Sequence, residues 1–236
     1  MSAPFTTVPS KAKSIEFIAI RPGTFLMGCS PGDPDAYSDE KPAHQVSITK
    51  SFDIGKFPVT QAQYEAVTGV NPSYFPGPTH PVEGVNWDEV QKFCEKLNAL
   101  HDGYAYRLPN EAEWEYAARA GCTSCRYGEL DDVAWHHGNS DGSTHPIGLK
   151  RPNAWGLYDT LGNVWEWVQD RYAPDYYSRS PERDPSGAAT GDYRIARGGS
   201  WRGIARGPSR VSSRYILKST VRSIVVGFRI ARQLAG

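Results

Sequence analysis

The strongest hydrophobic periodicity in the chain predicts an amphipathic helix over residues 86–103. Asn86 is a good N-cap, and Glu89 lies three residues later, which is the spacing of a capping box. The apolar residues that follow recur at helical spacing and form one stripe that we expect to be buried: Val90, Phe93, Cys94, Leu97 and Leu100.

Residues 110–121 show the same signals and predict the second main helix. Asn110 is the cap, Glu113 stands three residues behind it, and Gly121 is a natural stop. A shorter helix is expected between Thr60, which can cap it, and Gly69, which can end it.

Alternation of apolar and polar residues predicts short strands on both sides of these helices. Residues 15–28 suggest a hairpin around Pro22 and Gly23, and residues 44–60 also alternate. After residue 121 the helical periodicity ends, and short strand-like pieces alternate with loops rich in Gly, Asn, Asp and Pro. We therefore expect one α+β domain with a loop-rich second half.

The charges balance overall, with Lys+Arg 26 and Asp+Glu 26, but no acidic residue follows Asp192. Ten basic residues follow it, so an acidic protein partner or a nucleic acid is one interpretation. The other is that these arginines tie down loops, since each guanidinium has five donors for carbonyl and carboxylate groups. We favour the second for most of them.

Nothing in the sequence predicts a membrane span or a secretory signal, so we expect a cytoplasmic chain with a flexible N-terminus over residues 1–13. Display on a cell or virion surface stays open. The cysteines do not suggest a disulfide framework, and Cys122 and Cys125 form a lone CxxC without further soft ligands beside it. Cys94 is expected in the core.

No familiar catalytic motif occurs in the chain. His136 and His137 are adjacent, and on a strand they would face opposite ways. Glu113 and Glu115 are explained by capping and solvation. Oxygen ligands for a structural calcium ion are available in Asn163 and Glu166, although we favour turn hydrogen bonds and core tryptophans as the explanation of that region.

Several motifs together identify a resemblance that covers roughly residues 14 to 232. "HQVSITKSFDIGKFPVTQAQYEAV", "YRLPNEAEWEYAARAG", "NAWGLYDTLGNVWEW", "RGGSW" and "GFRIAR" occur in the order expected. The chain resembles the formylglycine-generating-enzyme (sulfatase-modifying factor) family. This resemblance implies a single C-type-lectin-like domain, which would extend over residues 14–236.

Catalytic members of that family bind copper through two cysteines shortly after the "RGGS" turn. Here no cysteine follows Cys125, so we do not expect an oxidase. The chain is also similar to variable proteins of diversity-generating retroelements. Those carry their variation between a "GGSW"-like turn and a "GFR"-like end, where Asn codons are altered at their adenines.

This chain has no Asn after Asn163, and residues reachable from Asn codons cluster between the two motifs. They predict a variable ligand-binding segment at about residues 202–226, which should face solvent: Arg202, Gly203, Ile204, Tyr215, Ile216, Ser223, Ile224 and Val225, with Gly207 and Ser213 as weaker candidates. Residues 218–222 are interpreted as fixed sequence between the clusters. Leu217, Val221, Val226, Phe228 and Ile230 are expected to be buried.

Arginine, tyrosine and aliphatic residues together are typical of protein-binding surfaces. The sequence therefore predicts a display protein that binds an unknown protein ligand and requires no cofactor, beyond the calcium ion considered above. The alternative is a metal-dependent oxidase or tailoring enzyme of the same family. Nucleic acid is not the expected partner, because aliphatic residues are interspersed among the arginines.

Overall fold

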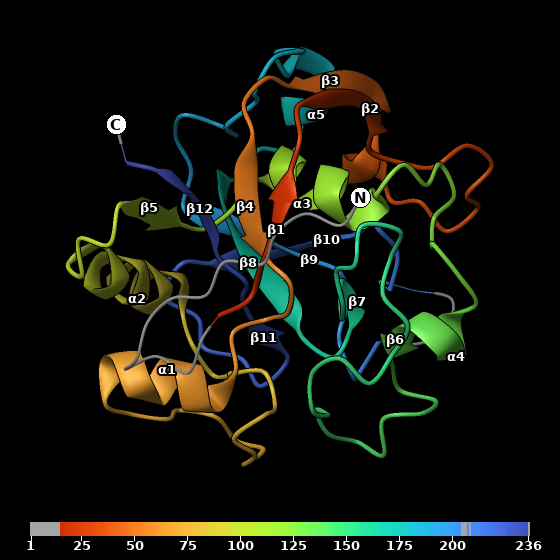
Figure 1. Ribbon diagram of the computed structural model, residues 1–236. Helices are drawn as coiled ribbons and strands as arrows, with labels where there is room; N and C mark the ends of the chain where they lie inside the picture. Colours follow the sequence, from red (N-terminus) through yellow and green to blue (C-terminus); the bar gives the residue numbers. More distant parts are fainter. Residues whose placement is uncertain (1–14, 204–206, 208, 236) are drawn as a thin grey trace.

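Two four-stranded sheets organise the computed structural model, which describes residues 15–203, 207 and 209–235 (Figure 1). The first sheet has the order β1-β4-β12-β5 and is antiparallel, so it joins the beginning of the chain to its end. Its strands are β1 (Phe17–Ile20), β4 (Phe52–Gly55), β12 (Ala231–Leu234) and β5 (Tyr104–Arg107).

The second sheet has the order β10-β9-β8-β11, with β10 at one edge. Strand β11 runs parallel to β8, while the other pairs are antiparallel. The strands are β8 (Trp165–Arg171), β9 (Tyr193–Arg197), β10 (Arg214–Lys218) and β11 (Val226–Gly227). The candidate variable segment therefore begins after β9, contributes the edge strand β10 and ends at β11.

The hairpin predicted around Pro22 and Gly23 is wrong. Strand β1 pairs with β4, whereas β2 (Gly23–Met27) pairs with β3 (His44–Ile48) in a separate two-stranded sheet. The glycine has a packing role instead, since a Cβ atom at position 23 would lie 2.2 Å from the hydroxyl oxygen of Tyr116. The chain turns a corner between two sheets at this point, against the third helix.

The three longer helices form where the caps predict them: α1 (Gln61–Thr68), α2 (Trp87–Asn98) and α3 (Glu111–Arg119). Thr60 and Asn86 close capping boxes, and Gly69 ends α1 in the left-handed conformation. Helix α2 ends at Asn98, so Leu100 lies beyond the buried stripe and is 53% exposed. Every residue of α3 is buried, including Glu115, which solvation therefore does not explain.

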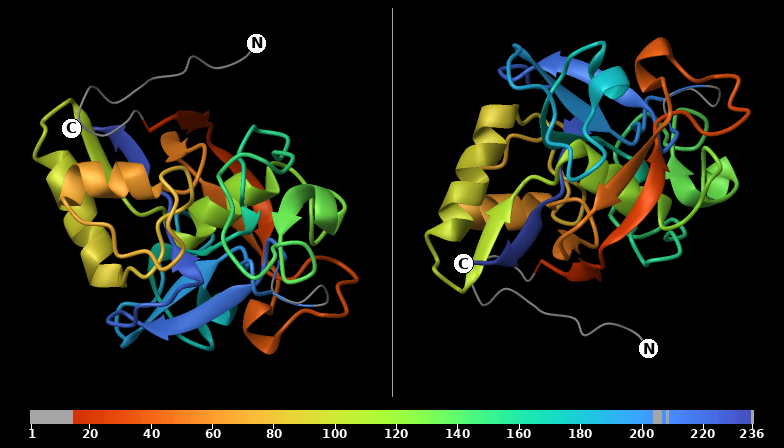
Figure 2. Two further views of the ribbon diagram at one scale, coloured as in Figure 1. Left: turned by 90° about the horizontal axis from the view of Figure 1, so that it is seen from below. Right: turned by 90° about the horizontal axis from the view of Figure 1, so that it is seen from above.

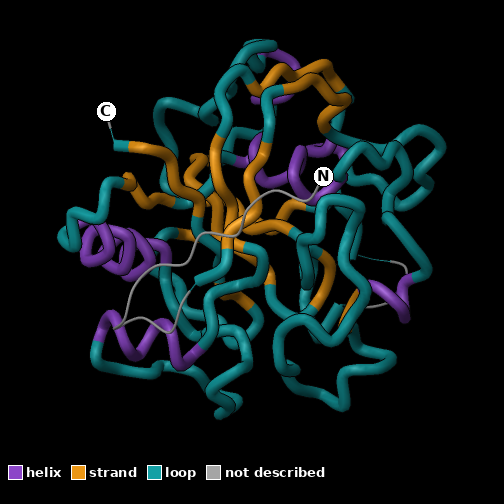
Figure 3. Tube along the Cα trace, viewed as in Figure 1, coloured by secondary structure: helices purple, strands orange, loops and turns teal. Residues whose placement is uncertain are grey.

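Loops and short elements make up the rest of the second half, as expected. These elements are α4 (Leu130–Val133), β6 (Ala134–Trp135), β7 (Leu161–Gly162) and α5 (Tyr176–Arg179), and a further short helix, η1 (Ser38–Glu40), lies in the first half. Figure 3 shows loops forming most of the trace around β6 and β7. No helix in the described ranges is long and apolar enough to cross a membrane.

The main core packs α1 and α2 against both four-stranded sheets, with Tyr64, Phe93 and Phe228 in mutual ring contact. Cys94 belongs to this core, as predicted. Of the residues expected to be buried near the C-terminus, Leu217, Val226, Phe228 and Ile230 are buried. The exception is Val221, which is 36% exposed because it lies in the turn after β10.

Candidate ligand-binding surface

Buried ion pairs hold the C-terminal arginines to the interior helix α3. The Arg197 guanidinium contacts Glu111 at 2.9 Å and also pairs with Glu115, and Arg214 contacts Glu111 at 2.7 Å. Burial alone would raise the pKa of the Glu111 carboxyl, but Arg214 and Arg197 hold that pKa below its usual value. The Glu111 carboxyl is therefore ionised in the folded protein.

Three further arginines are paired in the same way with carboxylates from earlier in the chain. Arg210 contacts Glu40 at 2.6 Å and Asp33 at 2.7 Å. Arg229 contacts Glu166 at 2.6 Å, and Arg232 contacts Asp53 at 3.0 Å. Together with backbone carbonyls that Arg197 and Arg229 also bind, these contacts confirm that most of the C-terminal arginines tie down the fold.

An open pocket of about 750 Å³ lies where the candidate variable segment meets the loop before β3. Six residues predicted to be variable line this candidate pocket: Arg202, Gly203, Tyr215, Ser223, Ile224 and Val225. Six residues outside that prediction complete it: Tyr37, Ser38, Asp39, Trp165, Ser200 and Arg214. The fold thus brings three sequence clusters, at residues 202–203, 215 and 223–225, together on one concave surface.

Main-chain atoms hold the predicted variable residues of this pocket in place. The carbonyl of Ser223 accepts from the amide of Gly84 at 3.0 Å, and that of Val225 from the amide of Trp165 at 2.8 Å. The carbonyl of Ile224 accepts from the indole nitrogen of Trp201 at 3.1 Å. These bonds fix the backbone whatever the side chains are.

Main-chain hydrogen bonds also hold the clusters that contain Gly203 and Tyr215. Gly203 donates to the carbonyl of Ser200 and accepts from the amide of His137, both at 2.9 Å. Tyr215 lies in the ladder between β10 and β9, opposite Ala196. Among the described residues, no hydrogen bond is formed by the Arg202 guanidinium or the Tyr215 hydroxyl, although the Tyr215 ring stacks on Trp165 at 5.2 Å. The Arg202 side chain is therefore uncommitted to the fold, whereas the Tyr215 ring packs against the main core and leaves only its hydroxyl without a partner among the described residues.

Some predicted variable positions lie elsewhere. Ser213 is completely buried in a tight turn after Arg210, and Gly207 is buried where its carbonyl accepts from Arg210 Nε at 3.3 Å. The Arg210 side chain draws this turn inward toward Glu40, so the exposure expected at both positions is wrong. Ile216 is partly exposed but does not line the pocket, and Ile204 is outside the described residues.

Sequence reasoning missed the wall opposite the variable segment, formed by Tyr37, Ser38 and Asp39. We call these three residues the constant wall. Arg214 Nη1 donates to the carbonyl oxygen of Asp39 at 2.8 Å, and the Glu40–Arg210 pair holds the next residue. In the left view of Figure 2 the orange η1 lies beside the start of the blue β10. Only the acidic run over residues 33–40, which contains Asp33, Asp35, Asp39 and Glu40 and no basic residue, could have hinted at this contact.

The oxygen atoms proposed for calcium are already used by the protein. Both Glu166 oxygens bind Arg229, and one of them also accepts from the indole nitrogen of Trp114 at 2.6 Å. The Asn163 amide exchanges two hydrogen bonds with the backbone of His145, and its φ of 57° is that of a turn. The turn and core contacts therefore account for Asn163 and Glu166, and the guanidinium of Arg229 takes the oxygen atoms that a calcium ion would have used.

The other residues considered for chemistry are dispersed. His136 is buried and contacts Asp131 at 2.6 Å, while His137 is exposed. Cys122 and Cys125 are free thiols, and Cys122 points its sulfur at the Arg126 carbonyl at 3.4 Å. Within the part of the chain that the structure describes, no three His, Cys, Asp or Glu side chains come together in a way that could hold a metal ion.

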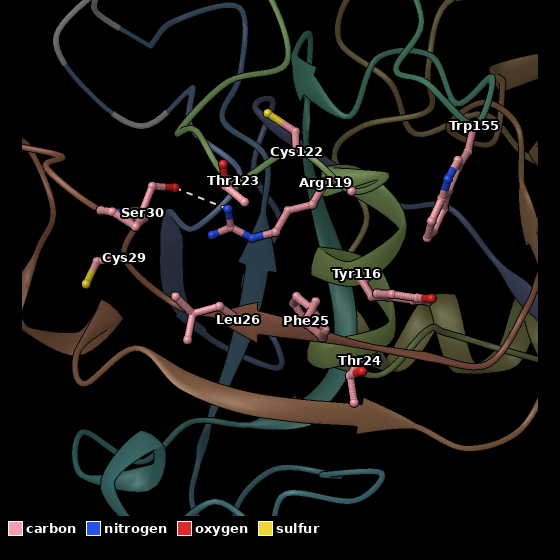
Figure 4. Close-up of a pocket in the computed structure, with 12 residues that line it drawn as sticks. Thr24, Phe25, Leu26, Cys29, Ser30, Tyr116, Arg119, Cys122, Thr123 and Trp155 are labelled. Carbon is pink, nitrogen blue, oxygen red and sulfur yellow. Dashed lines mark hydrogen bonds between the residues drawn. The ribbon is translucent and has the colours of Figure 1, made fainter.

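A second, smaller cavity of about 290 Å³ lies between β2 and the end of α3 (Figure 4). Phe25, Tyr116 and Trp155 form its apolar side, and Cys122 borders it. Arg119 lies in the middle but is saturated by Glu115, Ser30 and the carbonyl of Gly28. This cavity belongs to the scaffold and contains no residue of the candidate variable segment.

Comparisons with known proteins agree with this architecture. The model of the sulfatase-modifying factor enzyme 1-like domain matches residues 4–234. Variable protein 1 of Treponema denticola superposes with a TM-score of 0.88 at 30% identity, covering 98% of this chain and 99% of that one. PvdO from Pseudomonas aeruginosa superposes with a TM-score of 0.86, also at 30% identity, over 99% of this chain and all of its own.

Curated relatives include enzymes and larger proteins. The formylglycine-generating enzyme of Streptomyces coelicolor is 41% identical over 52% of this chain and 43% of its own length. The serine/threonine-protein kinase pkn1 of Chlamydia pneumoniae is 31% identical over 93% of this chain and 38% of its own. The chain thus spans about two-fifths of the length of these relatives.

Proposed function

The chain belongs to the sulfatase-modifying factor enzyme 1-like family, and from this premise we propose that it is a ligand-binding display protein rather than an enzyme. Its candidate pocket would be diversified by a retroelement on a rigid C-type-lectin-like scaffold. The ligand would be a protein, because the surface mixes tyrosine, arginine and aliphatic side chains.

The observation that carries this proposal is that hydrogen bonds to main-chain carbonyls hold the pocket backbone, so the shape of the backbone does not depend on the side chains at these positions. Ser223, Ile224 and Val225 are held through their carbonyls by Gly84, Trp201 and Trp165. A surface held in this way can change its side chains without losing its shape. Because the backbone is already ordered, binding would cost little conformational entropy.

Similarity to variable protein 1 of Treponema denticola supports the same role, since the two chains share nearly their whole length. The predicted variable residues in the pocket, such as Arg202 and Tyr215, are all types reachable from an Asn codon by adenine changes. The intervening turn at residues 218–222 has its own fixed task, because Arg222 pairs with Glu89 and Ser219 caps Trp87 through its carbonyl.

The direct test is to sequence the DNA around the gene. We expect a reverse-transcriptase gene and a near-identical copy of the segment that has Asn codons at the pocket positions of the three clusters. A neighbourhood that contains neither would contradict diversification. Display on a cell or virion surface would follow only if the intact protein were also found there by surface labelling.

The alternative function is a metal-dependent oxidase or tailoring enzyme, favoured by the 41% identity to a formylglycine-generating enzyme. The family resemblance places copper-binding thiolates after the "RGGS" turn, where this chain has Arg202 and Gly203 and no later cysteine. Metal analysis of the purified protein, with an assay on a cysteine-containing peptide, decides between the two. Stoichiometric copper together with peptide oxidation would establish the enzyme.

A further inference from the structure

The constant wall gives the candidate pocket a charged group that does not belong to the diversified segment. Asp39 lines the pocket and is partly buried there. Its main-chain carbonyl is bound by Arg214, so the position of the residue is set by the scaffold. Any ligand that fills the pocket therefore meets Asp39 regardless of which residues the variable positions carry.

Among the described residues, no cation pairs directly with this carboxylate. Arg214 directs Nε and Nη2 to Glu111, at 2.7 Å and 3.0 Å, and Nη1 to the Asp39 carbonyl. Arg210 is taken by Glu40 and Asp33. Arg202 lines the same pocket without an ion pair to Asp39 within the described residues. The carboxylate is thus available to a partner.

Partial burial makes such an unpaired carboxylate costly to leave alone. Burial is the main cause that raises the pKa of Asp39 above its ordinary value, and Arg214 only partly opposes it. A cation that enters the pocket and pairs with the carboxylate would remove this penalty. Hydrogen bonds to a charged group in a partly desolvated site are stronger than those on an open surface.

Aromatic rings beside Asp39 complete the site. Tyr37, two residues before Asp39 in the constant wall, is 54% exposed although the Arg210 guanidinium lies over its ring at 5.6 Å, and Trp165 and Tyr215 form a stacked pair within the same pocket. Aromatic faces attract ammonium and guanidinium groups, and guanidinium also stacks on rings. Carboxylate and rings together favour a planar or compact cation with an apolar stem.

We propose that Asp39 and Tyr37 form a constant subsite that receives an arginine or lysine side chain of the protein ligand. This inference rests on the proposed function and deepens it. Diversified residues would select the ligand, while the constant wall would require a basic residue of the ligand at the position facing Asp39. Ligands of all diversified copies would then share that residue.

The test uses N-acetyl-arginine amide as the probe and the uncharged N-acetyl-citrulline amide as its isostere, titrated by NMR into the whole protein. We expect the arginine probe to bind about 3- to 10-fold more tightly than the citrulline probe, in the millimolar range. Asp39→Asn should abolish that preference. Asp35→Asn removes the same charge from the same loop outside the pocket and should leave it intact.

Equal binding of the two probes by the unmodified protein would overturn the subsite, and so would a preference that survives Asp39→Asn. Asp39→Ser, checked for an unchanged melting temperature, is the second variant if Asn disturbs the fold. Neither result bears on diversification, which the genomic search tests alone. Absence of a template copy would contradict the proposed function even if the arginine preference were found.

Discussion

At the scale of single residues, the C-terminal arginines separate into two groups. Arg197, Arg210 and Arg229 are fully buried and paired with carboxylates, so they stabilise the fold from within. Arg202 is exposed in the candidate pocket and has no partner among the described residues. The same residue type therefore serves as an internal tie in one place and as a contact side chain in another.

The buried ties should be far more important for stability than exposed pairs of the same spacing. Glu115→Gln leaves Arg197 and Arg119 short of a buried countercharge, and we expect it to lower the free energy of unfolding by about 3–5 kcal/mol. Asp175→Asn removes an exposed pair with Arg179, also four residues apart, and should change little. Urea unfolding of both variants decides; equal effects would contradict the distinction.

A buried carboxyl outside the ion pairs predicts a pH dependence of stability. Burial raises the pKa of Asp159 to about 6, although Gly148 donates a hydrogen bond to it. The unfolded carboxyl ionises near 3.8, so the folded state pays for an ionised Asp159 above pH 6 and not below pH 4. Asp159→Asn should therefore stabilise the protein at pH 8 by on the order of 2 kcal/mol, and by much less at pH 4.5.

Asp141→Asn is the matched control for this prediction. Both residues have a positive φ, which Asn tolerates well, but Asp141 is exposed. The control should show the same small effect at both pH values. A stabilisation by Asp159→Asn that does not depend on pH would show that backbone preference, rather than ionisation, is responsible.

At the scale of elements, the short segment before β11 marks the boundary between the candidate pocket and the hydrophobic core. Ile224 lines the pocket and is partly exposed, whereas Val226, two residues later, is completely buried. The carbonyl bonds from Trp201 and Trp165 keep the backbone in register between them. Tolerance to substitution should therefore change sharply within two residues.

Substitution to arginine at these two positions tests that boundary. Ile224→Arg should cost less than about 1 kcal/mol, because the new side chain can extend into solvent. Val226→Arg places a charge in the core and should cost more than about 3 kcal/mol. Free energies of unfolding from denaturant titration measure both. A severe loss at Ile224 would mean that the segment is part of the core.

The corner between β1 and β2 is a second element with a specific steric origin. Gly23→Ala brings a Cβ atom to 2.2 Å from the Tyr116 hydroxyl oxygen, so we expect a cost of about 1–3 kcal/mol. In a Tyr116→Phe background the nearest atom recedes to the ring carbon at 3.2 Å, and most of the cost should disappear. A double-mutant cycle with no coupling would contradict this explanation.

At the scale of the whole molecule, local signals in the sequence were enough for the helices and for the family. The capping boxes at Asn86 and Asn110 specify helix starts within a few residues, so they could be predicted. The pairing of β1 with β4 could not, because strand partners are chosen by packing distant in sequence. The same holds for the constant wall, which meets β10 only through the folded arrangement of Arg214 and Glu111.

Which positions of the variable segment are buried could also not be predicted from the sequence. Ser213, a weaker candidate than Arg202, still counted as a variable position in the sequence, yet it is fully buried and Arg202 is exposed. The difference arises from Arg210, whose pairing with Glu40 pulls the turn before β10 into the interior. Candidate variable positions therefore have to be sorted by the fold before they are interpreted as a binding surface.

The most direct test of the central claim is to sequence this gene in many cells of the source population. We predict amino-acid differences at Arg202, Tyr215 and Ile224 and at their neighbours in the pocket, with changes only at positions derived from adenine. Residues 218–222, Ser213 and the constant wall should be invariant. Uniform sequence across the pocket, or variation spread evenly along the chain, would contradict the account.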